Sequence, residues 1–132
     1  MSKLDFFVKK FFKVPNTYGT SMMFGIGTRN AKVCAPISFE HLLGNVDGQS
    51  WGLAHDGKTY FNGKEQQFCV PFGDHKPSTV GIFFDGWNRT LSFSVNDEPL
   101  RVAFMDLNLN QILYPMVSRL VSIISIAKSP LF

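Results

Sequence analysis

The segment VGIFFDGWNRTLSFSVN, residues 80–96, shows the clearest secondary-structure pattern of the chain. In its second half, Leu91, Phe93 and Val95 alternate with small polar residues, which is typical of a strand with one buried face and one solvent-facing face. Its first half, residues 80–84, is apolar on both faces, so we expect a central strand there. The four residues 86–89 join the two halves as a hairpin. An antiparallel sheet is therefore predicted as the framework of the chain.

Short apolar runs separated by turn residues continue on both sides of this hairpin. Turns are indicated by Asp56-Gly57, Asn62-Gly63 and residues 96–99. Further strands are predicted over residues 22–27, 50–53, 59–61, 68–70, 102–104, 112–118 and 120–127. The chain of 132 residues thus has room for one domain with about eight or nine short strands. This spacing is typical of an all-β sandwich or barrel.

The composition limits the function classes. Hydrophobic residues make up 45% and charged residues 17%, which favours a folded core. The net charge of +3 is small and comes largely from lysines in the first 13 residues, so we expect no nucleic-acid partner. No apolar run approaches the roughly 18 residues of a membrane span, and no secretory leader is recognisable. We expect a protein of the cytoplasm or nucleus with no membrane partner.

The first 14 residues show a different periodicity. Leu4, Phe7, Val8, Phe11 and Phe12 recur at steps of three and four residues, with lysines between them. This spacing predicts a short amphipathic helix. Such a helix would bind a membrane surface or a partner. Otherwise it would pack its apolar face on the sheet, or the segment would not be native to this fold. We favour packing on the sheet.

Catalytic and metal-binding patterns are not found. The chain has no CxxC, HExxH, P-loop or GxSxG motif, and its histidines stand singly in predicted loops. The two cysteines are interpreted as buried free thiols of a reducing compartment. We therefore expect a binding module that is not an enzyme and needs neither cofactor nor metal. We considered several residues as metal ligands, nucleophiles or an acid pair and favour none of them in these roles. They are His41, His55, His75, Asp56, Asp74, Asp85, Asp97, Cys34 and Cys69.

Several blocks of sequence together resemble a known family. They are residues 18–28 (YGTSMMFGIGT), 42–45 (LLGN), 50–53 (SWGL), 60–63 (YFNG), 80–85 (VGIFFD), 90–93 (TLSF), 102–104 (VAF) and 113–117 (LYPMV). In this order and spacing they resemble the SPRY domain (B30.2/SPRY-like) of the SPRY domain-containing SOCS box family. The resemblance covers about residues 17–119 and narrows the expected fold to a bent, concanavalin-like antiparallel β-sandwich.

The resemblance also implies a function. Members of that family are substrate receptors of cullin–RING ubiquitin ligases. Their SPRY domain holds a short, Asn-containing peptide of the target protein on its loops, and a C-terminal SOCS box binds elongins and a cullin. By this resemblance the chain is a protein-interaction module with a peptide of a target protein as its partner.

Six positions carry the implied peptide site. They are Gly19 and Thr20, Phe39 and Leu42 in the long loop, and Leu120 and Val121. Phe39 stands where several family members have Tyr, and Val121 where some have Trp, which would make the site shallower. Each position also has an interpretation without a ligand, in which Gly19 serves a turn and the apolar residues are core.

The chain departs from the family at both ends. Residues 1–16 resemble nothing in the family, so residues 17–128 are expected to form a partial SPRY domain that lacks the first strands. No SOCS box is recognisable, so we expect elongin and cullin to be reached only indirectly. Two alternatives stay open: a truncated remnant or splice product that binds nothing and recruits no ligase, and a carbohydrate-binding or hydrolytic β-sandwich, which needs a carboxylate pair or metal cluster.

Overall fold

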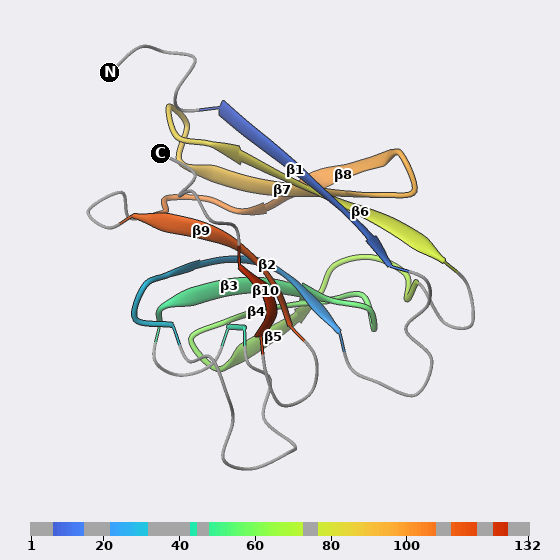
Figure 1. Ribbon diagram of the computed structural model, residues 1–132, viewed down its shortest axis with the longest axis horizontal. Helices are drawn as coiled ribbons and strands as arrows, with labels where there is room; N and C mark the ends of the chain where they lie inside the picture. The colour runs from blue at the N-terminus through green and yellow to red at the C-terminus, as the bar shows by residue number, and fades with distance from the viewer. Residues whose placement is uncertain are drawn as a thin grey trace.

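The computed structural model describes residues 7–14, 22–31, 43–44, 48–72, 77–107, 112–118 and 123–126. Within these residues the chain forms ten β-strands and no helix (Figure 1). The strands are β1 (Phe7–Val14), β2 (Met23–Thr28), β3 (Ser50–Ala54), β4 (Lys58–Phe61), β5 (Lys64–Gln67), β6 (Ser78–Asp85), β7 (Thr90–Val95), β8 (Glu98–Phe104), β9 (Leu113–Ser118) and β10 (Ile123–Ile126).

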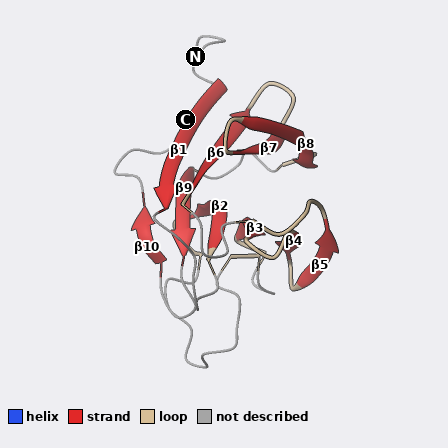
Figure 2. Ribbon diagram, turned by 90° about the vertical axis from the view of Figure 1, so that its right-hand side faces the viewer, coloured by secondary structure: helices blue, strands red, loops and turns tan. Residues whose placement is uncertain are grey.

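Two antiparallel sheets form the two layers of a sandwich (Figures 1 and 2). The first has four strands in the order β1-β6-β7-β8, and the second has six in the order β10-β9-β2-β3-β4-β5. The prediction of an all-β antiparallel sandwich is confirmed. The strand predicted to be central, β6, lies between β1 and β7 and pairs with both.

Three tight turns set the register of their strands. In the β6–β7 hairpin the Asp85 carboxylate accepts the backbone N–H groups of Trp87 (3.0 Å) and Asn88 (3.1 Å). The two-residue turns 62–63 and 96–97 have positive φ at both positions, as the twist of a hairpin requires. The second turn places Val95 opposite Glu98, so β8 begins at Glu98, earlier than predicted.

The prediction of a strand over residues 68–70 was wrong. The strand is β5, over Lys64–Gln67, because the 62–63 turn pairs Lys64 with Phe61 and continues the ladder from there. All four β5 residues are exposed, so no apolar alternation marks this edge strand in the sequence. Phe68 is buried instead against Arg101 of β8, whose guanidinium lies 4.3 Å from the ring centroid.

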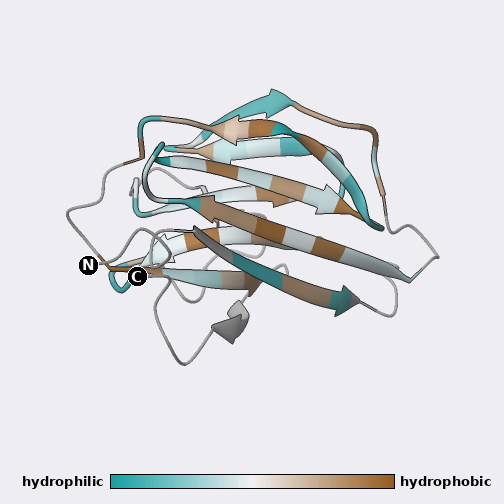
Figure 3. Ribbon diagram, turned by 90° about the horizontal axis from the view of Figure 1, so that it is seen from above, coloured by the Kyte–Doolittle hydropathy of each residue, from teal (hydrophilic) through white to brown (hydrophobic). Residues whose placement is uncertain are grey.

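The core lies between the inner faces of the two sheets. Strands are banded by hydropathy in Figure 3, and the inward positions belong to alternate residues. The four-stranded sheet contributes Val80, Ile82, Phe84, Leu91 and Phe93, each at most 1% exposed. The six-stranded sheet contributes the buried residues Phe24, Ile26, Trp51, Leu53, Leu113 and Val117. Each such large side chain stabilises the fold by about 1.5–3 kcal/mol.

An aromatic row joins the two sheets. Trp51 and Phe61 are cross-strand neighbours, and their rings stack with centroids 5.0 Å apart. Phe61 in turn meets Phe104 of β8 edge to face at 6.5 Å. Aromatic pairs of this kind add about 0.5–1.5 kcal/mol beyond the area that they bury.

The prediction of a helix at the start of the chain was wrong for residues 7–14, which form β1. Residues 1–6 lie outside the described residues. β1 pairs with β6 along its whole length and turns Phe12, opposite Val80, toward the core. An isolated helix of about 14 residues is marginal in water, so pairing with β6 outweighs the helical spacing of the apolar residues. The segment was expected to pack on the sheet, and Phe12 does pack against the core, but from a strand and not from a helix.

Candidate functional site

The six residues implied as a peptide site lie outside the described residues. They are Gly19, Thr20, Phe39, Leu42, Leu120 and Val121. Their assignment therefore stays a prediction. The strands that these segments adjoin are described, however, and they decide whether one binding site is geometrically reasonable.

The segments that hold Gly19-Thr20 and Leu120-Val121 adjoin neighbouring strand ends. Met23, at the start of β2, pairs with Ser118 at the end of β9. Ser118 also pairs with Ile123 at the start of β10. The same end of the sheet holds Ala54, the partner of Met23 on β3. Two chain segments almost one hundred residues apart, by their numbers, thus enter and leave the sheet side by side, as a shared site requires.

Backbone hydrogen bonds hold the neighbouring turn at this end. The N–H of His55 donates to the carbonyl of Met22 (3.1 Å), and the His55 carbonyl accepts the N–H of Phe72 (2.9 Å). The 55–57 turn is thereby tied both to the entry of β2 and to the chain after Phe68. A rigid base of this kind is what loop-borne recognition needs.

The end of the long loop is fixed to the outer face of the six-stranded sheet, the face turned away from the core. Leu43 is fully buried there, in contact distance of Met23 and Gly52. The N–H of Gly44 donates to the Ser50 hydroxyl (2.8 Å), and its carbonyl accepts the N–H of Gly63 (2.8 Å). These bonds hold the chain directly after the predicted site residue Leu42.

Gly44 and Ser50 were not singled out from the sequence as loop anchors. Gly44 has φ +78°, and a Cβ there would overlap the Tyr60 carbonyl. The only available signal was the Leu-Leu-Gly-Asn block itself, since glycine is the residue that tolerates this backbone conformation. Ser50 is fully buried, and its only signal was its place in the Ser-Trp-Gly-Leu block of residues 50–53.

Tyr60 links this outer-face cluster to the 55–57 turn. Its side chain is buried, and its hydroxyl donates to the Asp56 carboxylate over 2.9 Å. Burial raises the pKa of Tyr60 above its ordinary value, and the hydrogen bond and the negative charge of Asp56 raise it further. The other Asp56 oxygen accepts the N–H of Lys58 (2.9 Å). The pair is therefore a neutral donor and a turn-forming carboxylate.

The described ionisable residues include one free cysteine and no cluster of metal ligands. Cys69 is a free thiol, as predicted, but it is half-buried where a buried thiol was expected. Burial raises its pKa despite the neighbouring Arg101. A thiol with a raised pKa is less often in the reactive thiolate form, so it is a poor nucleophile. No three of the described His, Cys, Asp and Glu residues come together as metal ligands. Of the residues weighed earlier, Cys34, His41, Asp74 and His75 lie outside the described residues.

No helix among the described residues is both long and apolar enough to cross a bilayer.

Comparison with known proteins identifies the domain. The SPRY domain family profile matches residues 8–122, a stretch that begins inside β1. The curated SPRY domain-containing SOCS box protein 3 of Xenopus tropicalis is 38% identical over 101 residues, and that of Xenopus laevis is 37% identical. In both cases the match covers 76% of this chain and 27% of the relative. The chain therefore spans about a quarter of the length of these relatives.

A solved structure shares the fold. The stonustoxin structure matches 86% of this chain, with a TM-score of 0.54 and 19% identity, over 19% of its own length. At this identity the likeness concerns the arrangement of strands alone.

Proposed function

This chain belongs to the SPRY domain family, and from that membership we propose that it binds a short, Asn-containing peptide of a target protein on its loops. It is related to the SPRY domains of SOCS box proteins, which are interaction modules. The proposed site combines Gly19, Thr20, Phe39 and Leu42 with Leu120 and Val121.

One observation carries the proposal. The pairing of Met23 with Ser118 brings the start of β2 and the end of β9 together. The two flanking segments therefore have a common base, although they lie far apart in the sequence. An extended peptide held there would be fixed by polar groups that match its backbone and by a few apolar anchors.

The test is a binding screen with short peptides. An array of peptides that each contain one Asn is probed with the full chain and with the Thr20→Arg and Val121→Asp variants. We expect Asn-dependent binding that both variants weaken by at least about tenfold, since a buried charge or an overlapping side chain disrupts a small site. Binding that is absent, or equal in all three proteins, would contradict the proposal and favour the non-binding remnant.

A role in ubiquitination is a further part of the proposal. The SPRY domain is the target-recognising part in this family, and we propose that this chain recognises the target while elongins and a cullin reach it through another protein. We also propose that it works in the cytoplasm or nucleus. A pull-down with purified elongin B and C is expected to show no direct association. Direct capture by the full chain would overturn this part while leaving peptide binding intact.

A further inference from the structure

The register of the four-stranded sheet fixes which side chains share its outer face. One row across the strands runs Lys9, Phe83, Ser92 and Val102, from β1 to β8. The next row runs Phe11, Gly81, Ser94 and Pro99. In both rows the β7 residue is a serine, with bulkier residues on β8 and on β1 or β6. The outer face is therefore low along β7 and raised on both sides.

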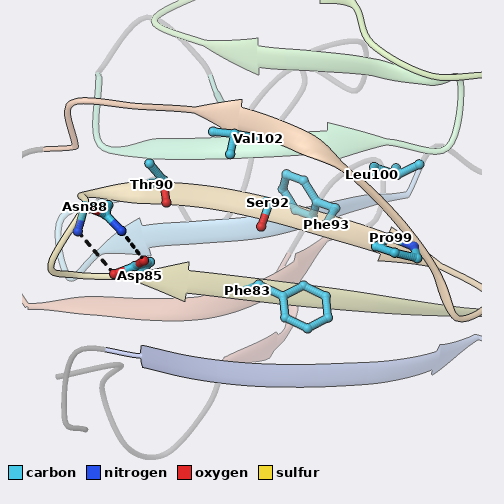
Figure 4. A pocket seen from close by; sticks show the side chains of 9 residues that line it. All are labelled: Phe83, Asp85, Asn88, Thr90, Ser92, Phe93, Pro99, Leu100 and Val102. Carbon is cyan, nitrogen blue, oxygen red and sulfur yellow. Dashed lines mark hydrogen bonds between the residues drawn. The ribbon is translucent and has the colours of Figure 1, made fainter. Parts of the chain in front are cut away.

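A groove follows from this pattern. It is an open pocket of about 490 Å³ over β7 (Figure 4). Phe83 forms one wall and Val102 and Pro99 the other, while Thr90 and Ser92 place two hydroxyl groups between them. Its lining residues are Phe83, Asp85, Asn88, Thr90, Ser92, Phe93, Pro99, Leu100 and Val102. We call these residues the β7 groove.

The far wall of the groove is shaped by irregular pairing. The β7–β8 register shifts between Leu91 and Ser92 and again between Ser92 and Ser94. Such bulges bend a strand and change the direction of its side chains, and they are common beside binding sites. They place Val102, which is 42% exposed, at the rim of the groove.

The near wall continues to β1 as an exposed apolar surface. Gly81 carries no side chain, and the rings of Phe11 and Phe83 meet over it edge to face at 5.7 Å. Phe11 is 54% exposed in spite of this contact. An exposed aromatic ring that extends an apolar groove is a feature of interaction surfaces.

Two lysines lie on the β1 side of the groove, whereas acidic residues lie at its ends, Asp85 in the β6–β7 hairpin and Asp97 and Glu98 beside Pro99. Lys9 lies opposite Phe83, and Lys13 lies two residues beyond Phe11 on the same face, and both are exposed. The acid at the end of the groove, Asp85, already accepts three hydrogen bonds from its own hairpin, including the Asn88 side chain (2.7 Å). An incoming group on the β1 side therefore meets cations.

We propose that the β7 groove and the adjoining Phe11 surface bind a second protein through an extended segment with one large apolar side chain and acidic residues beside it. The apolar side chain fills the groove between Phe83 and Val102. The backbone of the segment exchanges hydrogen bonds with the Thr90 and Ser92 hydroxyls, each of which donates and accepts. The acidic residues lie against Lys9 and Lys13.

The size and shape of the groove favour a peptide segment. Its volume falls within the range of about 300–1,000 Å³ that holds small ligands, and an aromatic or long aliphatic side chain leaves room for backbone. The surface is independent of the peptide site proposed above, which adjoins strand ends of the other sheet. A result that disproves one proposal therefore leaves the other intact.

The test is selection from a random peptide library displayed on phage, with the full chain as bait. The Ser92→Trp variant fills the groove, Val102→Glu places a negative charge at its rim, and the K9E/K13E double variant reverses the flanking charge. The control is Gln66→Trp on β5, an exposed strand position in the other sheet. Thermal unfolding of each protein identifies variants that do not fold.

We expect a family of acidic peptides with one central apolar residue. Their affinity falls at least about tenfold in Ser92→Trp and in Val102→Glu, stays unchanged in Gln66→Trp, and falls with K9E/K13E more at low salt than at high salt. The proposal is overturned if no selected peptide depends on Ser92 and Val102, or if the dependent peptides are not acidic. Dimerisation that Ser92→Trp abolishes in sedimentation, or groove-dependent binding to phosphatidylserine vesicles alone, would also overturn it.

Discussion

The ring of Phe11 on β1 meets the ring of Phe83 on β6 edge to face, with centroids 5.7 Å apart and an interplanar angle of 90°. The contact exists because β1 pairs with β6 and because Gly81, opposite Phe11, leaves room for both rings. It ties the first described strand to the β6–β7 hairpin. Residues 7–14 are thus part of the sandwich.

A substitution in β1 tests this docking. Phe12 packs partly against the core, opposite Val80, so Phe12→Ala is expected to cost about 2 kcal/mol, roughly half the cost for a fully buried Phe. Lys10→Ala, on the same face but exposed, is the matched control and should change the free energy of unfolding by less than about 0.5 kcal/mol. Urea denaturation measures both. Equal effects would mean that β1 does not pack on the core.

Alanine substitutions at two glycines with similar backbone conformation separate the cost of backbone strain from the cost of steric overlap. Gly44 (φ +78°) and Gly48 (φ +68°) both sit in the left-handed region, but a Cβ at Gly44 would overlap the Tyr60 carbonyl, whereas at Gly48 it meets only Asn62 Oδ1 at 3.9 Å. Gly48→Ala should cost about 1 kcal/mol for the backbone alone.

Gly44→Ala is expected to cost about 1–3 kcal/mol more than Gly48→Ala, because the chain must move away from β4. The comparison of their unfolding free energies is the measurement. If the two variants lose the same stability, the anchoring of the long loop at Gly44 is wrong.

How far the sequence predicts this fold depends on whether a pattern is local. The β6–β7 hairpin shows alternation and a turn, so its strands follow from the residues themselves. β5 shows no alternation, because all four of its residues are exposed, and its place follows only from the 62–63 turn. β1 has apolar residues spaced as in a helix, and only the available edge of β6 makes it a strand.

The candidate surfaces show the same limit. The family resemblance pointed to loop residues that the described structure does not include, whereas the β7 groove has no sequence signal. Thr90 and Ser92 are ordinary for the solvent-facing side of a strand. They form the base of a groove only because the register places them between Phe83 and Val102. A pairing of three strands with bulges cannot be derived from one sequence.

The buried Tyr60 predicts a dependence of stability on alkaline pH. Its folded-state pKa is raised above the ordinary value of 10.0, so the folded state keeps the phenol proton more strongly than the unfolded state does. The contribution of Tyr60 to stability is fully present below pH 10.0 and is lost as the pH rises above that value.

Tyr60→Phe should remove this dependence and, near neutral pH, cost about 1 kcal/mol for the hydrogen bond to Asp56. Denaturation of both proteins at about pH 9 and about pH 11 measures the difference, since these values lie on either side of the ordinary tyrosine pKa. A stability gap between wild type and variant that does not narrow at the higher pH would contradict the role assigned to Tyr60.

Arg101 makes a contribution to stability that we expect lysine not to replace. Its guanidinium lies over the Phe68 ring, and its Nη1 donates to the Phe68 carbonyl at 2.7 Å, which joins β8 to the chain after β5. Arg101→Ala is expected to cost about 1–2 kcal/mol, the sum of a hydrogen bond and a cation–π contact.

Arg101→Lys should recover less than half of that loss, because an ammonium group lacks the planar geometry that allows stacking and a directed hydrogen bond together. Thermal unfolding of the two variants decides this. Full recovery by lysine would show that charge alone holds Phe68 in place.

The proposed function requires that the loops adjoining the start of β2 and the end of β9 hold a peptide. Hydrogen exchange with mass spectrometry, on the full chain with and without an Asn-containing peptide from the array, measures this binding segment by segment. We expect slower exchange in residues 17–21 and 119–122 when the peptide is bound, with the β7 groove unchanged. Slower exchange confined to residues 90–102, or no change in any segment at saturating peptide, would contradict it.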